Sequence, residues 1–241
     1  MMYNDLAFPT LAGRPYVFAN FVQTVDGKVN VLADPRAYWP LGSETDHETL
    51  LQLRAHADVL LHGKHTAVFL RHLDKLGTRA FQERRCTLGK DRPILYGITS
   101  AHPDGTLAPY LENPPSGTSS LLITTRDAPV PIDVAAAAQV VRFGDNQVDL
   151  HALSGFLREQ GHRTILLEGG PTLLASFLAA DVLDELFVTI APKIIGSRNN
   201  STLTMVEGTL FAPDQVKRLQ LISIRQVEDE VYLRYRLRRK D

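Results

Sequence analysis

The sequence predicts an α/β fold built on a mostly parallel mixed sheet, with helices on both faces and an antiparallel hairpin at the C-terminal end. Short apolar strand patterns alternate with helical patterns along most of the chain, and this alternation is typical of parallel sheets. The second half shows helix, glycine stop, buried strand and helix in that order. At the end of the chain, two strand patterns flank the acidic turn 228–230, which indicates a hairpin.

The first half of the chain contains strand patterns separated by turn signals. The run 15–22 predicts a strand, and Thr45 with Glu48 three residues later forms a capping box that predicts a helix start. The proline-rich segment 100–119 predicts a long surface loop. Further strands are expected over 58–61, 93–99, 121–125 and 140–143, with a linker that starts at Asp127.

Two amphipathic helices are expected in the second half. Asp149 is predicted to cap the first helix, and Gly161 ends it before a buried strand that leads to Glu168. The second helix begins at Pro171, and a strand over 185–191 follows it. The apolar face of the first helix is formed by Leu150, Leu153, Phe156 and Leu157.

In the final strand, 231–237, apolar residues alternate with polar ones, which predicts a strand with one buried and one exposed face. The exposed positions include Arg234, Arg236 and Arg238. A solvated edge strand explains these arginines better than a nucleic-acid patch, because charges on an edge prevent aggregation.

Length, composition and charge favour one ordinary globular domain. The chain has 241 residues, 44% of them hydrophobic and 22% charged, which suffices for one domain over 1–241 with a core over about 14–238. The formal net charge of −1 provides no long-range attraction to nucleic acid or anionic membranes. Neither a bilayer-spanning apolar run nor a signal peptide is recognisable, so we expect a cytoplasmic protein.

The residues that commonly bind metals do not form a recognisable set. Cys86 is the single cysteine, which excludes an intramolecular disulfide. His62, His65 and His72 lie close together in sequence, but neither an HExxH motif nor a closed ligand set accompanies them. The sequence therefore predicts no metal.

The stretch around Glu168 is the most informative part of the sequence. A buried strand leads to this carboxylate, which is followed by Gly169, Gly170 and a helix start at Pro171. Glycines allow close approach of a ligand, and a helix start directs unpaired N–H groups and partial positive charge towards it. This combination predicts a phosphate-binding turn, although a plain strand-to-helix turn with a surface Glu is an equally good interpretation of these residues alone.

Ligands of open parallel sheets bind at the carboxyl ends of the strands. By this rule the turn after Val22, the turn after Leu61 and the glycine doublet 169–170 are expected to converge on one cleft. Three segments far apart in sequence would then share one site.

Two sets of short motifs occur along the chain in a fixed order. The first set comprises Pro15-Tyr16-Val17, Thr24-Val25-Asp26-Gly27-Lys28, Gly42-Ser43 with Asp46, Leu53-Arg54-Ala55, Ala57-Asp58, and Gly63 with Thr66. The second set comprises Leu167-Glu168-Gly169-Gly170-Pro171-Thr172-Leu173, Asp184-Glu185-Leu186 and Ala191-Pro192-Lys193-Ile194-Ile195-Gly196. In this order and spacing, the motifs resemble the reductase domain of riboflavin biosynthesis over about residues 14–237.

The resemblance implies a dihydrofolate-reductase-like three-layer αβα fold, NADPH as hydride donor, a phosphoribosylaminopyrimidine as substrate and a homodimer. Carried over by position, it places the cofactor beside Gly63, Thr66, Gly169, Gly170, Pro171, Thr172 and Leu173. Ser100 is the candidate for the 2′-phosphate pocket. The substrate positions are Asn20, Thr24, Asp26, Ser43, Arg54 and Glu168, with Arg54 expected to hold the ribose phosphate through a bidentate fork.

The implied reaction is reduction of a ring-opened ribose at C1′ to a ribityl chain, for which the protein must bring hydride donor and imine carbon together and exclude water. Glu168 is the first candidate for a catalytic acid and Asp26 the second. In the alternative, Glu168 makes a ground-state hydrogen bond to the pyrimidine and solvent supplies the proton.

Three departures from the family pattern are visible. Asn20 stands where many bifunctional members have a lysine, which excludes a lysine-based mechanism here. The segment after Thr66 lacks the family's acidic and proline-containing continuation, which weakens the expected substrate identity. A deaminase domain is not expected, because one cysteine cannot build its zinc motif. A same-fold reductase of a pterin, dihydrofolate or specialised pyrimidine, and a non-catalytic nucleotide-binding module, remain the alternatives.

Overall fold

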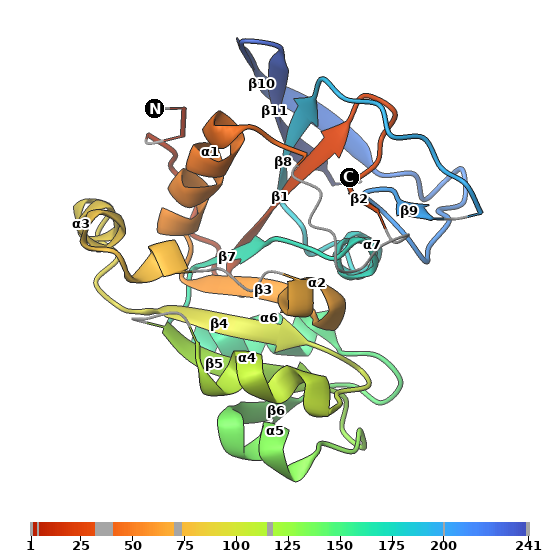
Figure 1. The fold of residues 1–241 in the computed structure, drawn as a ribbon. Helices are drawn as coiled ribbons and strands as arrows, with labels where there is room; N and C mark the ends of the chain where they lie inside the picture. The colour runs from red at the N-terminus through yellow and green to blue at the C-terminus, as the bar shows by residue number, and fades with distance from the viewer. Residues whose placement is uncertain are drawn as a thin grey trace.

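A computed structural model describes residues 2–3, 5–31, 41–69, 74–114, 118–199 and 201–239. In these ranges nine strands form one sheet in the order β10-β11-β8-β1-β7-β3-β4-β5-β6 (Figure 1). The strands are β1 (Tyr16–Thr24), β3 (Val59–Gly63), β4 (Ile94–Thr99), β5 (Thr118–Thr124), β6 (Gln139–Arg142), β7 (Thr164–Leu167), β8 (Glu185–Ala191), β10 (Arg218–Val227) and β11 (Glu230–Arg238). A separate small sheet joins β2 (Asn30–Val31) to β9 (Thr202–Leu203).

The strands from β8 to β6 are all parallel, whereas β11 runs antiparallel to β8 and to β10. The predicted mostly parallel sheet with a C-terminal antiparallel hairpin is therefore confirmed. Parallel strands need helical crossovers, which here cover both faces of the sheet.

The helices form two layers, and each layer packs on one face of the sheet through its own apolar cluster. The first cluster joins the sheet to α1 (Glu44–Ala55), α2 (Lys64–Phe69), α3 (Arg79–Thr87), α4 (Ala108–Glu112) and α5 (Ile132–Ala137). The second joins the opposite face to α6 (Leu150–Glu159) and α7 (Pro171–Ala179) (Figure 1). In the central strand β1, Phe18 belongs to the first cluster and Val17 and Ala19 to the second, so both faces of the strand are buried.

The caps of two helices can be compared with their predictions. Asp149 caps α6 as predicted, because one of its carboxylate oxygens accepts the N–H groups of His151 and Ala152 at 3.0 Å each. The capping box at Thr45 was wrong. The N-cap of α1 is Ser43, two residues before Thr45; Ser43 has an extended backbone, and its Oγ accepts the N–H of Asp46 at 3.2 Å.

The predicted loop 100–119 was also wrong. It contains a 3-10 turn (Gly105–Leu107) and α4, with Leu107 and Leu111 fully buried in the first cluster; residues 115–117 lie outside the described ranges. A proline at the start of α4 suits the first helical turn, where its missing N–H has no partner to lose. The linker after Asp127 likewise contains α5, and the short helices α2 and α3 were not predicted.

The expectation that the final strand is a solvated edge was wrong as well. The strand β11 lies between β8 and β10, and β10 is the edge. Arg234 and Arg236 donate to the two oxygens of the fully buried Glu185 at 2.7 and 3.1 Å. These arginines therefore neutralise a buried carboxylate of the neighbouring strand.

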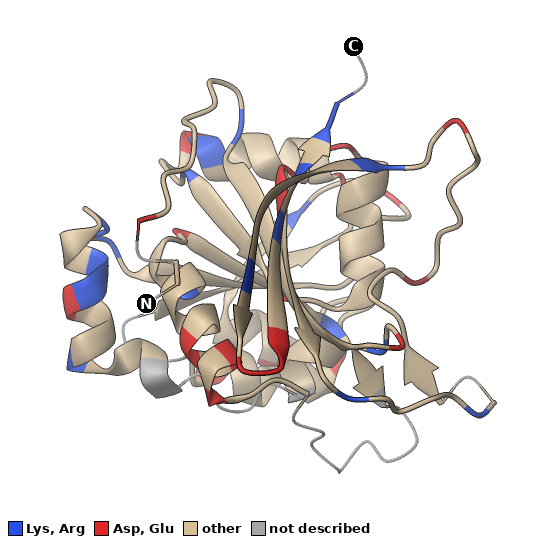
Figure 2. Cartoon of the chain, turned by 90° about the horizontal axis from the view of Figure 1, so that it is seen from above, with Lys and Arg blue, Asp and Glu red and all other residues tan. Residues whose placement is uncertain are grey.

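Figure 2 shows that Lys and Arg positions are interspersed with Asp and Glu positions over the fold. Among the described residues, no helix is long and apolar enough to cross a membrane.

Candidate active site

The strands β3 and β7 end side by side at the centre of the sheet, next to the middle of β1, which continues to Thr24. Ala19 of β1 and Leu61 of β3 both pair with Leu167 of β7, which lies between them. Asn20, His62 and Glu168 each follow one residue later. These positions share the sheet face of Phe18, Leu60 and Leu166, which belong to the first cluster below α1. Polar side chains thus replace apolar ones where β3 and β7 end, and at the adjacent position of β1.

Glu168 and Arg54 form a buried ion pair at this edge. Arg54 donates from Nε to Oε1 and from Nη2 to Oε2 of Glu168, both at 2.6 Å. Each side chain is only 4% exposed. The fork joins the last turn of α1 to the end of β7, and it does not use the third guanidinium nitrogen, Nη1.

His62 contacts the same carboxylate from the neighbouring strand. Its Nε2 lies 3.1 Å from Oε2 of Glu168, and its side chain is fully buried. Its other ring nitrogen, Nδ1, is buried and has no hydrogen-bond partner among the residues that the structure describes. The ring of Tyr96 lies 5.5 Å away, centre to centre.

Glu168 is ionised in this setting. Burial disfavours its charge, but the guanidinium of Arg54 and the hydrogen bonds from Arg54 and His62 outweigh burial and lower the pKa of Glu168 to about 2. An acid with this pKa holds no proton to donate at neutral pH. The geometry therefore argues against Glu168 as a catalytic acid and favours its alternative role as a hydrogen-bond acceptor.

The glycine doublet lies directly beside the end of β3. The N–H of Gly63 donates to the carbonyl of Gly169 at 2.8 Å, and the peptide bond between Gly169 and Gly170 is cis. A side chain at Gly170 would place its Cβ 3.0 Å from Oγ1 of Thr66, and Gly169 has a φ of +119°. Phe21 of β1 is also close to the doublet. Of the three turns expected to converge, the turn after β3 and the glycine doublet are therefore in direct contact.

The helix α7 starts immediately after the doublet. Gly170 is its N-cap residue and Pro171 occupies the first turn, and no side chain caps the helix. The N–H groups of Thr172 and Leu173 therefore lie in an uncapped first turn, and the Cβ of Leu173 faces Gly63. A small-residue turn at an uncapped helix start fits a phosphate group.

Ser100 lies at the end of β4 and is buried. Its Oγ accepts the N–H of His102 at 3.2 Å, so the hydroxyl closes a local turn. Nearby, Lys64 donates to the carbonyl of His102 at 3.1 Å and to Asp104 at 2.8 Å. The positive charge of Lys64 beside this turn is thus partly neutralised by Asp104.

Thr24 and Asp26 form a turn further along β1, four residues beyond Asn20 and roughly 13 Å away along the strand. Thr24 donates its hydroxyl to Asp26 at 2.6 Å. The Asp26 carboxylate also accepts the N–H groups of Ile195 and Gly196 at 3.3 and 2.7 Å. The Thr24 hydroxyl and these N–H groups lower the pKa of Asp26, so this acid too is ionised.

Ser43 joins α1 to the tip of the C-terminal hairpin. Its N–H and Oγ donate to the two oxygens of Glu230 at 2.8 and 2.5 Å, and Tyr232 donates to the same carboxylate at 2.5 Å. Figure 2 shows the acidic tip of the hairpin beside the start of α1. The hydroxyl of Ser43 is thus committed to the helix cap and to Glu230.

Asp46 is a buried acid that sequence reasoning included in a motif without assigning it a role. It is 8% exposed, and its Oδ1 is buried without a hydrogen-bond partner. Burial raises its pKa to about 6; the nearby charge of Glu230 acts in the same direction, and a hydrogen bond with Thr189 opposes both. Local sequence does not indicate that Asp46 is buried. For the contact of His62 with Glu168, the only signal in the sequence is a histidine inside an apolar strand.

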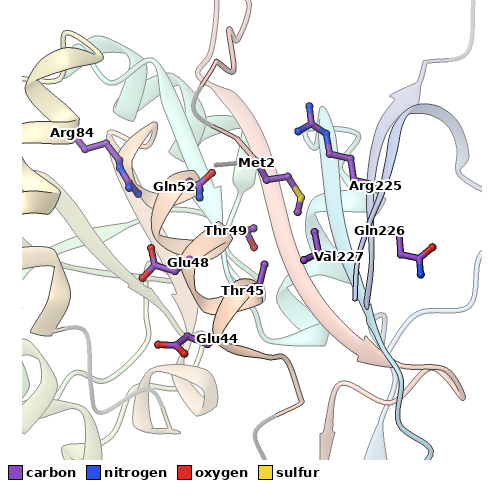
Figure 3. A pocket seen from close by; sticks show the side chains of 10 residues that line it. All are labelled: Met2, Glu44, Thr45, Glu48, Thr49, Gln52, Arg84, Arg225, Gln226 and Val227. Atoms are coloured by element: carbon purple, nitrogen blue, oxygen red, sulfur yellow. The ribbon is translucent and has the colours of Figure 1, made fainter. Parts of the chain in front are cut away.

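A cavity of about 980 Å³ lies on the flank of α1 and is distinct from the strand ends (Figure 3). None of the residues discussed above as site positions lines it. Its lining comes from the N-terminus, α1, α3 and β10: Met2, Glu44, Thr45, Glu48, Thr49, Gln52, Arg84, Arg225, Gln226 and Val227.

In the part of the chain that the structure describes, no group of three or more His, Cys, Asp or Glu side chains is placed to hold a metal ion. His72, one of the three histidines weighed from sequence, lies outside that part. His62 is engaged by Glu168, and His65 is exposed on α2.

Fold and site together define an α/β protein with a glycine turn at an uncapped helix start and a buried Arg–Glu pair at the carboxyl edge of its sheet. Residues 15–233 match the family described as RibD C-terminal domain, and the chain belongs to this family.

Individual relatives agree with this assignment. Over 192 residues the chain is 29% identical to the 2,5-diamino-6-ribosylamino-4(3H)-pyrimidinone 5′-phosphate reductase of Archaeoglobus fulgidus, a match that covers 79% of this chain and 86% of that protein. The enzyme of the same name from Methanothermobacter thermautotrophicus is 26% identical over 216 residues, with 85% and 90% covered. A solved pyrimidine reductase-like protein from Corynebacterium diphtheriae shares the fold, with a TM-score of 0.75, 22% identity and 94% and 93% coverage.

The raised pKa of Asp46 predicts how replacing it changes stability with pH. Because folding disfavours the ionised form of Asp46, this carboxyl group lowers the free energy of unfolding when it is ionised. The destabilisation is complete above pH 6 and absent below the ordinary pKa of 3.8. We therefore expect Asp46→Asn to raise the free energy of unfolding at pH 8, on the order of 3 kcal/mol for a shift of about two units. The gain should vanish near pH 3.5, as measured by urea unfolding.

Asp26→Asn is the matched control, because its pKa shift has the opposite sign. It should lower stability at pH 8, and this loss should fade in acid. An Asp46→Asn variant that is less stable than the parent at pH 8 would contradict the raised pKa.

Proposed function

We propose that this protein is an NADPH-dependent reductase of riboflavin biosynthesis that acts in the cytoplasm. Its substrate is a phosphorylated ribosylaminopyrimidine of the 5-amino-6-(5-phosphoribosylamino)uracil type, and its reaction converts the ribosyl group to ribityl by hydride transfer to C1′. One observation carries the proposal: an ionised, buried Glu168 held by Arg54 lies directly beside the glycine turn at an uncapped helix start.

The glycine turn fits the phosphates of a dinucleotide. We propose that Gly169, Gly170 and the first turn of α7 bind the pyrophosphate through backbone N–H groups. Thr66 packs against the doublet and offers its hydroxyl to the same phosphates, and Gly63 keeps the turn close to β3. When bound there, NADPH supplies the hydride.

We propose that the pyrimidine phosphate lies between α1 and the strand ends. Arg54 would offer the nitrogen not used by Glu168 to the substrate phosphate. Asn20 lies one residue beyond the pairing of β1 with β7 and offers an amide to the pyrimidine. Ser43 and the turn of Thr24 and Asp26 would shape the outer wall, since their polar groups already bind neighbouring loops.

The ionised state of Glu168 determines its role. We propose that it accepts a hydrogen bond from the pyrimidine in the ground state and keeps Arg54 in place. The proton that completes the reduction then comes from solvent, because the same low pKa excludes Glu168 as its source at neutral pH.

The names of the two archaeal relatives suggest a substrate that still carries the amino group at position 2. Both this diaminopyrimidinone and the deaminated uracil are therefore candidates. Steady-state oxidation of NADPH and NADH with each compound, and with dihydrofolate and a pterin as alternatives, would identify the preferred pair. A protein that binds NADPH tightly and turns over none of these compounds would be a nucleotide-binding module, as the second alternative requires.

We also propose a homodimer that uses the edge strand β10. Three of its apolar side chains are exposed, Leu219 at 39%, Leu221 at 48% and Ile224 at 61%. An exposed, long apolar edge strand invites pairing with another chain.

Replacing these side chains should separate the protomers. We expect Leu221→Lys with Ile224→Lys to shift the mass measured by light scattering from dimer to monomer. Leu210→Lys is the control, because Leu210 is exposed but lies outside β10. A monomeric parent protein would refute the dimer.

Removing the charge of Glu168 should impair turnover but not cofactor binding. Glu168→Gln keeps the size of the side chain and loses the ion pair with Arg54, so we expect at least a tenfold lower kcat, about 1.4 kcal/mol of transition-state stabilisation. NADPH affinity, measured by fluorescence titration, should stay within a factor of three. Glu83→Gln, on the exposed face of α3, serves as control; unchanged turnover of Glu168→Gln would exclude Glu168 from the reaction.

A methyl group in the glycine turn should act on the cofactor. In Gly170→Ala the new Cβ would lie 3.0 Å from Oγ1 of Thr66 and would occupy space at the helix start, so we expect at least tenfold weaker NADPH binding. Gly155→Ala in α6 is the matched control, because its Cβ meets nothing within 4 Å. Equal affinities of the two variants would place the cofactor elsewhere.

A further inference from the structure

His62 stands in an apolar environment that does not favour it. The three preceding residues of β3, Val59, Leu60 and Leu61, are all fully buried, and so is His62. A buried imidazole loses its hydration and must find partners inside the protein. Among the described residues, His62 has one hydrogen-bond partner, Glu168, and its other ring nitrogen is buried without a partner.

The contact with Glu168 determines where the imidazole proton lies. An ionised carboxylate only accepts hydrogen bonds, so Nε2 of His62 must carry the hydrogen that it shares with Oε2. In the neutral ring the lone pair then lies on Nδ1, which is the buried atom without a partner. Leaving such an atom unpaired costs about 1–3 kcal/mol. An aliphatic side chain at this position would avoid the cost.

Glu168 receives its hydrogen bonds from two directions. Arg54 reaches it from α1, one bond to each oxygen, and His62 adds a second bond to Oε2 from β3. Asn20 lies on the other neighbour of β7, the strand β1. With the bond from His62, Oε2 accepts two hydrogen bonds, whereas Oε1 accepts one. Oε1 is therefore the oxygen better able to accept a hydrogen bond from a ligand.

We propose that His62 is a positioning residue: its Nε2–H group fixes the carboxylate of Glu168 so that Oε1 is presented to the pyrimidine. The inference rests on the proposed function. Without His62, the carboxylate is held by Arg54 alone and can rotate with the guanidinium. The pyrimidine would then bind in more than one orientation, and fewer encounters would place its ribose carbon for reduction.

Two substitutions separate this role from a purely structural one. His62→Leu removes both ring nitrogens, whereas His62→Gln keeps an N–H donor close to the position of Nε2. We expect His62→Leu to lower kcat at least tenfold, to leave the KM for NADPH within a factor of two, and to unfold at the same or a higher temperature. His62→Gln should recover kcat to within about threefold of the parent. His151→Leu, on the exposed side of α6, is the control histidine.

The outcomes are distinguishable. Full activity of His62→Leu, or equal losses in both variants, would overturn the positioning role while leaving the reductase intact. A parent protein that reduces neither pyrimidine would refute the proposed function instead. Crystal structures then test the positioning directly: a displaced Glu168 carboxylate in His62→Leu, restored in His62→Gln, supports it, and an unmoved carboxylate overturns it.

Discussion

The buried pair of Arg54 and Glu168 is the interaction on which the site depends. Two opposite charges lie at the junction of α1 and β7, both almost fully withdrawn from water. Such a pair is tolerated only with excellent geometry, and removing one partner leaves an uncompensated charge that costs about 3–5 kcal/mol. The bidentate fork meets this condition. It fixes the last turn of α1 relative to the sheet, and with it the whole layer that covers Asn20 and His62.

The pair also joins regions of the sequence that are far apart. Arg54 belongs to the first crossover, whereas Glu168 ends the strand that lies next to β1 and β3 in the sheet. The glycine doublet follows Glu168 directly and touches Gly63 and Thr66. One strand end thus places a buried negative charge next to a glycine turn at an uncapped helix start.

Sequence patterns predicted the fold where hydrophobic periodicity was strong. The strands and the cap of α6 followed from alternating or helical apolar spacing, and the doublet with Pro171 was recognisable as a strand-to-helix turn. Prediction failed where helices were short: α4 begins among prolines that looked like a loop, and α3 is held by Arg85, whose guanidinium donates to distant carbonyls. It also failed at β11, because the partner of its arginines is a buried glutamate on another strand. The contact of His62 with Glu168 and the burial of Asp46 depend on tertiary packing, which local sequence does not encode.

The order of the strands has a consequence for how the chain assembles. The central strand β1 is made first, yet its two neighbours, β7 and β8, are made late: Tyr16 pairs with Thr164 and Phe18 with Glu185. Loop closure over such separations slows folding, because the entropy of the intervening chain is lost before the pairing contributes. During synthesis, the apolar segment of β1 therefore stays without its sheet partners until β7 and β8 have been made. The strands β3 to β6, which pair with near neighbours, can assemble sooner and provide the template that β7 and finally β1 join.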